Sequence, residues 1–100
     1  MINLENHLKN YLNPEGKLIS FPAKRKLKIA SMFYIASNID HEVMYSEKEI
    51  NEIINKICCF NDSALIRREM YNYRFINRTS DGKNYWKESI QPIPEQYGLS

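Results

Sequence analysis

The segment from residue 45 to residue 58 carries the strongest helix signal in the chain. Ser46 and Glu49 are spaced as a capping box, in which each side chain hydrogen-bonds the backbone amide of the other residue. Four isoleucines then recur at the i, i+3, i+4 and i+7 positions of one helix face: Ile50, Ile53, Ile54 and Ile57. We therefore expect a helix over residues 46–58 whose isoleucine face lies in the core.

A second helix is predicted after a break of only a few residues. Asp62 is a suitable N-cap, and Ile66, Met70 and Tyr73 share one face of the segment that follows it. This pattern predicts a helix over residues 62–73. Two consecutive helices joined by such a short break form a helix-turn-helix.

A hairpin is predicted directly after this pair of helices. The strand-like runs 75–79 and 84–87 flank Asp81-Gly82, a dipeptide typical of tight hairpin turns. Residues 43–45 are expected to join the hairpin as a third strand. The predicted fold class is therefore α+β, a winged helix-turn-helix with a small antiparallel sheet, in which the hairpin is the wing.

Further segments extend this unit at both ends. A helix over residues 22–38 should precede the helix-turn-helix, so the predicted winged-helix domain covers residues 17–88. Residues 1–16 are predicted to form an accessory N-terminal helix that either caps the domain or makes a homodimer contact. Its apolar stripe consists of Leu4, Leu8, Tyr11 and Leu12. The proline-containing residues 89–100 are expected to be a tail that lies along the surface or is mobile.

Composition excludes several classes of protein. With 100 residues and 43% hydrophobic content, the chain makes one small domain. No stretch reaches the roughly 20 apolar residues of a membrane span, and the polar start is no signal peptide, so we expect a cytoplasmic protein. Cys58 and Cys59 are adjacent, which fits neither a disulfide framework nor a zinc site, and helix-end packing is expected instead. The sequence carries no catalytic or cofactor-binding motif, so no enzyme activity, metal or cofactor is expected.

Positive charge is concentrated in two segments. Residues 17–28 carry five cations and no acid, residues 62–87 carry six cations and three acids, and residues 40–56 carry five acids and two lysines. The first group opposes the dipole of the 22–38 helix, which favours anions at that end. Because phosphate contacts dominate nucleic-acid affinity, the two basic segments could cooperate if they share one face. The candidate nucleic-acid-binding residues are Lys24, Arg25, Lys26, Lys28, Arg67, Arg68 and Lys83.

The basic residues of the last two elements also have structural alternatives. Arg67 and Arg68 point about 100° apart on a helix, so one of them is expected to bridge an acid within the fold. Arg68 lies farther from the apolar face and is the better candidate for an exposed contact. Lys83 either reaches a phosphate from the hairpin tip or belongs to a solvated turn beside Asp81.

Several of these motifs together resemble one bacterial family of domains of unknown function, the family numbered 2087. They are Ser20-Phe21-Pro22 before the basic run, the segment 45–51, Asp62 with Ile66-Arg67-Arg68-Glu69, and Arg78 with Asp81-Gly82 and Tyr85-Trp86. The resemblance spans residues 17–87 and implies a link to helix-turn-helix regulators of transcription. It also implies a glycine at the end of the second helix, where this chain has Arg74, which puts a left-handed turn at that position in doubt.

These observations predict a nucleic-acid-binding domain in transcription regulation, with duplex DNA favoured over RNA. A protein–protein interaction module is the alternative, because winged helices also bind proteins. Its docking surface would be the acidic residues 40–52 or the N-terminal helix. A homodimer is expected as well, since such domains commonly pair to read two half-sites.

Overall fold

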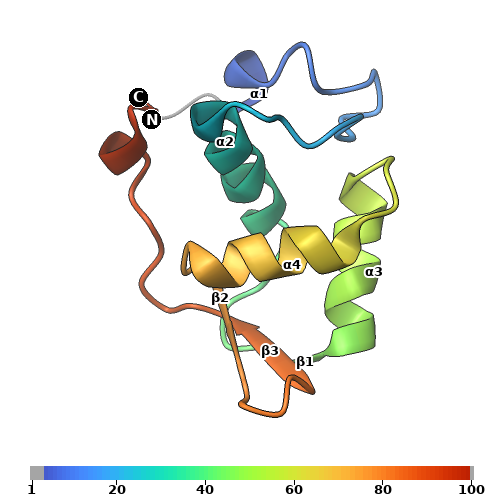
Figure 1. Cartoon of the computed structure of the whole chain (residues 1–100), viewed down its shortest axis with the longest axis vertical. Helices are drawn as coiled ribbons and strands as arrows, with labels where there is room; N and C mark the ends of the chain where they lie inside the picture. Colours follow the sequence, from blue (N-terminus) through green and yellow to red (C-terminus); the bar gives the residue numbers. More distant parts are fainter. Residues whose placement is uncertain (1–3, 100) are drawn as a thin grey trace.

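The two central helices begin and end close to the predicted boundaries. The computed structural model describes residues 4–99 and has the predicted α+β fold (Figure 1). Helix α3 (Glu47–Ile57) starts at the predicted capping box, with Ser46 Oγ 3.1 Å from the Glu49 amide and Glu49 Oε1 2.8 Å from the Ser46 amide. Helix α4 (Ser63–Asn72) follows after five residues and packs against α3. Together they form the helix-turn-helix.

A three-stranded antiparallel sheet lies beside these helices. Strands β2 (Ile76–Arg78) and β3 (Asn84–Lys87) form the predicted hairpin, and β1 (Tyr45–Ser46) pairs with the other side of β3. The third strand is confirmed, although it begins at Tyr45 and leaves Val43 and Met44 exposed. The sheet order β1-β3-β2 leaves β2 at the edge that faces α4 (Figure 1).

The remaining long helix, α2 (Arg25–Ala36), is shorter than the predicted span of residues 22–38. Lys24 occupies the N-cap with an extended ψ of 129°, so Pro22 and Ala23 lie before the helix. Buried side chains from α2, α3 and α4 meet in one core, which also contains Phe75 from the start of the hairpin and Tyr85 from β3. Phe33 packs edge-on against Phe75, with 4.8 Å between the ring centroids.

The N-terminal segment caps this core. Helix α1 (Leu4–His7) packs on α2, and Leu8 is fully buried. Leu4, Tyr11 and Leu12 are partly buried against the same core. The stripe therefore packs against the core of its own domain, as the capping alternative predicts.

The C-terminal segment runs back towards α2. Ile90 and Ile93 are exposed, as expected for a surface tail, but the 3-10 helix η1 (Pro94–Tyr97) contacts α2. Leu99 is fully buried and anchors the segment. The tail is therefore a packed part of the fold up to residue 99.

Helix α4 ends at a left-handed residue that is not glycine. Arg74 has a φ of 66°, so the left-handed turn is present despite the missing glycine. Its amide donates to the Tyr71 carbonyl at 3.1 Å, and the Phe75 amide donates to the Met70 carbonyl at 2.8 Å. These bonds form a Schellman motif, whose hydrophobic partners Met70 and Phe75 are fully buried. Burial of Phe75 thus holds Arg74 in a conformation that favours glycine.

Candidate nucleic-acid interface

The outer face of α4 consists of exposed residues that do not contribute to the core. Ile66 and Met70 are fully buried, whereas Ala64, Arg68 and Asn72 are exposed. At about 100° per residue, Arg68 lies about 180° around the helix from the midpoint between Ile66 and Met70. Within residues 4–99, the Arg68 side chain has no hydrogen bond or ion pair. The preference for Arg68 as the exposed arginine is confirmed.

Its neighbour Arg67 holds three elements together. The Arg67 guanidinium forms an ion pair with Glu47 at 3.2 Å and donates a hydrogen bond to Asn51, both on the α3 segment. It also lies 5.5 Å from the centroid of the Tyr85 ring on β3. Its side chain is only 16% exposed. Arg67 is therefore the member of the pair that bridges an acid within the fold, as expected of one of the two arginines.

A groove separates α4 from the hairpin. It has a volume of about 410 Å³ and is lined by Ala64, Arg67, Arg68, Tyr71, Asn72, Arg78 and Tyr85. The Arg78 guanidinium lies 5.0 Å from the centroid of the Tyr71 ring, which restricts this side chain to the α4 side of the hairpin. Two arginines that form no ion pair within residues 4–99, Arg68 and Arg78, thus line one groove.

Sequence reasoning missed Arg78 as a site residue. The alternation of side chains along a strand could have revealed it. Arg78 is two residues after Ile76 and therefore points to the same side of the sheet. Ile76 is buried against the helices. This placement predicts that Arg78 faces α4.

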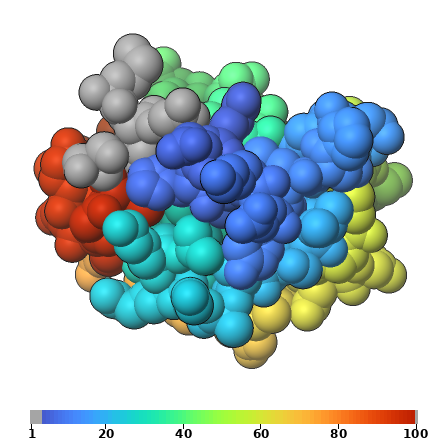
Figure 2. All heavy atoms as spheres, turned by 90° about the horizontal axis from the view of Figure 1, so that it is seen from above, coloured from blue at the N-terminus to red at the C-terminus, as the bar shows by residue number. Residues whose placement is uncertain are grey.

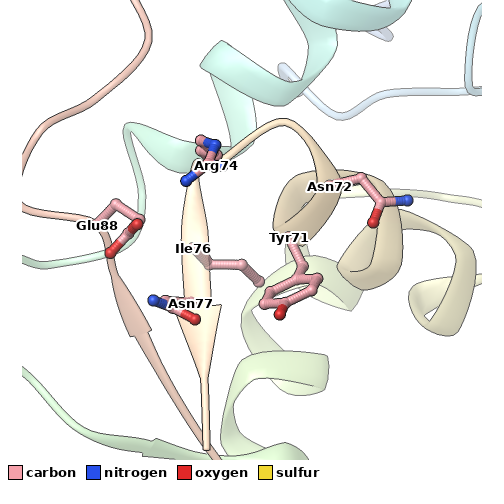
Figure 3. Close-up of a pocket in the computed structure, with 6 residues that line it drawn as sticks. All are labelled: Tyr71, Asn72, Arg74, Ile76, Asn77 and Glu88. Atoms are coloured by element: carbon pink, nitrogen blue, oxygen red, sulfur yellow. The ribbon is translucent and has the colours of Figure 1, made fainter.

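A second hollow of about 250 Å³ continues the groove beyond the end of α4 (Figure 3). It is lined by Tyr71, Asn72, Arg74, Ile76, Asn77 and Glu88. Tyr71 and Asn72 line both hollows, which are here named together the α4–β2 furrow. Arg74 adds a further cation to the furrow, and Glu88 places one carboxylate at its far end.

The basic start of α2 lies next to the C-terminal half of α4. The Arg25 guanidinium is 6.0 Å from the centroid of the Tyr73 ring and 5.6 Å from that of Tyr97, and Lys28 pairs with Glu69 at 3.7 Å. The two basic segments therefore adjoin one another. Figure 2 shows the start of α2 (cyan) and residues of α4 (yellow to orange) along the same edge of the molecule.

The candidate cations on α2 differ in their freedom to bind a ligand. Lys24 and Lys26 are exposed and have no partner within residues 4–99. Arg25 is exposed but is held against two tyrosine rings, and Lys28 is half-buried in its pair with Glu69. Lys24 and Lys26 are thus the residues of this group most available for an anion.

At the tip of the hairpin, Lys83 is exposed, and the carboxylate of the neighbouring Asp81 is hydrogen-bonded within the turn. The Asp81 carboxylate accepts from the Thr79 hydroxyl at 2.6 Å and from the Lys83 amide at 3.0 Å. The hydrogen bond from Thr79, followed by that from the Lys83 amide, lowers the pKa of Asp81. Gly82 has a φ of 72°, as the turn requires. Lys83 is therefore free, but a charged carboxylate lies next to it.

The chain also contains two cysteines and other residues of the kinds that bind metal ions. Among residues 4–99, no three His, Cys, Asp or Glu side chains lie close enough together to hold a metal ion. Cys58 is buried at the end of α3, and this burial, together with the neighbouring Cys59, raises its pKa to about 12. Cys59 is exposed and accepts a hydrogen bond from Asn13 at 3.5 Å. No helix in the same part of the chain is long and apolar enough to cross a membrane.

Comparisons with known proteins place the chain in one family. Residues 17–87 match a family model described as an uncharacterized protein conserved in bacteria (DUF2087). The match includes α2, α3, α4 and all three strands, and hence nearly the whole α4–β2 furrow. Neither the curated proteins nor the solved structures compared with the chain give a significant match. The family match covers well over half of the chain, which therefore belongs to the bacterial DUF2087 family.

Proposed function

We propose that this domain binds duplex DNA, with α4 in the major groove. The observation that carries the proposal is the unpaired Arg68, which lies on the outermost line of α4 beside a groove that also contains Arg78. Guanidinium groups in such a setting form hydrogen bonds with phosphate oxygens and base edges. A transcription-regulatory role is part of the proposal and derives from the family resemblance.

The shape of this surface favours a duplex with an open major groove. Helix α4 is the outermost element of its face (Figure 1), and the major groove of B-DNA, about 12 Å wide, accepts one helix. The corresponding groove of double-stranded RNA is too narrow for side chains to read. Duplex DNA is therefore preferred over RNA as the ligand.

Charge is distributed to suit this orientation. Arg25 and Lys28 border α4 on the α2 side, with the exposed Lys24 and Lys26 on the same first turn of α2, and Arg78 borders α4 on the hairpin side. Two of the neighbouring acids are paired within the fold, Glu69 with Lys28 and Glu47 with Arg67, which leaves Asp81 at the hairpin tip and Glu88 at the end of the furrow. Cations on both sides of the helix would contact the two phosphate backbones that border the groove.

Fluorescence-anisotropy titration of mixed-sequence duplex DNA at low and moderate salt tests the proposal. We expect the intact chain to bind tightly at low salt and the double variant Lys24→Glu/Lys26→Glu to lose affinity by roughly tenfold or more, with a smaller salt slope. The matched control is Lys48→Glu/Lys56→Glu, which reverses two exposed lysines of α3. Equal affinity for both double variants, or no binding at low salt, refutes the proposal.

A second function, protein binding, is favoured by an apolar groove on the β1 side of the sheet. The groove has a volume of about 690 Å³ and is lined by His41, Glu42, Val43, Met44, Trp86, Lys87 and Ser89. Met44 is 59% exposed at its rim. A protein partner that stays bound after nuclease treatment and in high salt, and is lost in Met44→Glu, would favour this function over DNA binding. A partner lost on nuclease treatment would favour DNA binding.

A homodimer that reads two half-sites remains a prediction of the DNA-binding proposal. Leu8 is fully buried within its own domain, so this residue of the N-terminal stripe is not available for the contact. Light scattering of the intact chain, with and without DNA at micromolar concentration, measures the oligomeric state. A monomer under both conditions removes the homodimer.

A further inference from the structure

We infer that Arg68 and Asn72 read the bases of the target, and that this target carries a guanine and an adenine about two base pairs apart. The inference rests on the proposed binding of duplex DNA and names the sequence that the same surface prefers. Both Arg68 and Asn72 are exposed, and within residues 4–99 neither side chain has a hydrogen bond or ion pair.

The position of these two residues on α4 sets them apart from the other cations. Arg68 lies on the helix line farthest from the core, and Asn72 follows it by one turn on the same side. The α2 segment touches α4 through Glu69 and Tyr73, and the hairpin touches it through Tyr71. The row of Arg68 and Asn72 therefore lies between the two cationic borders, where a groove-bound helix meets base edges rather than phosphates.

The chemistry of the two side chains then selects the bases. A guanidinium fork matches the O6 and N7 acceptors of guanine, and a carboxamide matches the N6 donor and N7 acceptor of adenine. Residues four apart on a helix rise by about 6 Å, which corresponds to about two steps of 3.4 Å along DNA. Ala64, one turn before Arg68, is small and lets the helix approach the groove floor.

The neighbouring arginines do not share this role. Arg67 is held by Glu47 and Asn51, and Arg78 is held over the Tyr71 ring at the hairpin border. Each is restricted by a partner within the fold, so neither can extend from the outer line of α4. The guanine contact is thereby assigned to Arg68.

Selection from randomised DNA duplexes, followed by sequencing of the bound fraction, tests the inference with the intact chain. We expect an enriched site with guanine and adenine about two base pairs apart. Arg68→Ala, which removes the fork, should lose roughly 5- to 150-fold of its preference for that guanine, measured as the ratio of its affinities for the selected site and for the same site with the guanine replaced. Asn72→Ala should lose the preference for adenine alone. Lys26→Ala is the control, because it should weaken all duplexes equally.

A modified base separates a direct contact from an indirect effect. Replacing the selected guanine by 7-deazaguanine removes the N7 acceptor, and this should weaken binding of the wild type but not of Arg68→Ala. Thermal melting of each variant checks the fold, which should be unchanged because both side chains are exposed. Tight binding without an enriched site, or a preference for guanine that Arg68→Ala leaves intact, overturns the inference while the proposed function stands. Absence of binding to any duplex at low salt overturns both.

Discussion

Replacement of Arg74 by glycine should stabilise the protein. Arg74 has a φ of 66°, and a left-handed residue with a side chain costs about 1–2 kcal/mol. Glycine removes that cost but adds about 0.5–1 kcal/mol of backbone entropy to the unfolded chain. The expected net gain is about 0.5–1 kcal/mol, which raises the midpoint of thermal unfolding by roughly 2–8 °C for a domain of this size.

The structure shows that the substitution removes no contact that stabilises the fold. The Arg74 side chain is exposed and has no hydrogen bond or ion pair within residues 4–99. The bonds of the Schellman motif come from the backbone amides of Arg74 and Phe75, and glycine keeps both. The stability gain should therefore report the relief of backbone strain alone.

Urea and thermal unfolding of three chains measure the effect. Arg74→Ala is the matched control, because it removes the same side chain but keeps the strained φ, and its stability should stay close to that of the wild type. If Arg74→Gly is no more stable than Arg74→Ala, the strain is absent and the reasoning is refuted. Because Arg74 lines the furrow, both variants should lose the same small amount of DNA affinity.

Other expected outcomes concern stability and reactivity. Arg67→Ala should lower the free energy of unfolding by about 1–2 kcal/mol in urea, whereas Arg68→Ala should change it by less than about 0.5 kcal/mol, since only Arg67 has partners in the fold. A thiol reagent should label Cys59 in the native protein and Cys58 only after unfolding, as mass spectrometry can show. The capping-box bonds lower the pKa of Glu49. The stability that ionised Glu49 contributes is therefore present above its ordinary pKa and is lost as the pH falls through the lowered pKa. Urea unfolding at a series of acidic pH values should show that the free energy of unfolding depends less on pH in Glu49→Gln than in the wild type.

The features that were predictable from the sequence are those with local causes. The capping box, the isoleucine stripe and the Asp81-Gly82 turn each act within a few residues, and the structure confirms α3 and the hairpin that they predict. Features that depend on a residue distant in sequence could not be predicted in this way. An apolar stripe on the first residues requires burial, but the stripe cannot show whether a second copy or its own core provides it, and Leu8 is buried in its own core.

The left-handed turn at the end of α4 illustrates the same limit. Glycine is the local signal for such a turn, and Arg74 lacks it. The turn forms because Phe75 must enter the core beside Met70, and burial of one aromatic side chain contributes about 1.5–3 kcal/mol, more than the strain of one residue costs. Tertiary packing overrides local preference where the larger free energy favours it.

In the candidate site too, local geometry predicted some residues and distant packing decided others. Helix geometry alone separated Arg68 from Arg67, because the buried face of α4 could be read from its apolar residues and fixes the direction of every other side chain. The same geometry could not place Arg78, whose role depends on the distance between a strand and a helix that are joined only by packing. The Tyr71 ring, at 5.0 Å from its guanidinium, brings the two elements into one groove. Removal of that ring in Tyr71→Ala should therefore free Arg78 and weaken DNA binding without removing any charge, whereas Tyr71→Phe, which keeps the ring face, should bind as the wild type does.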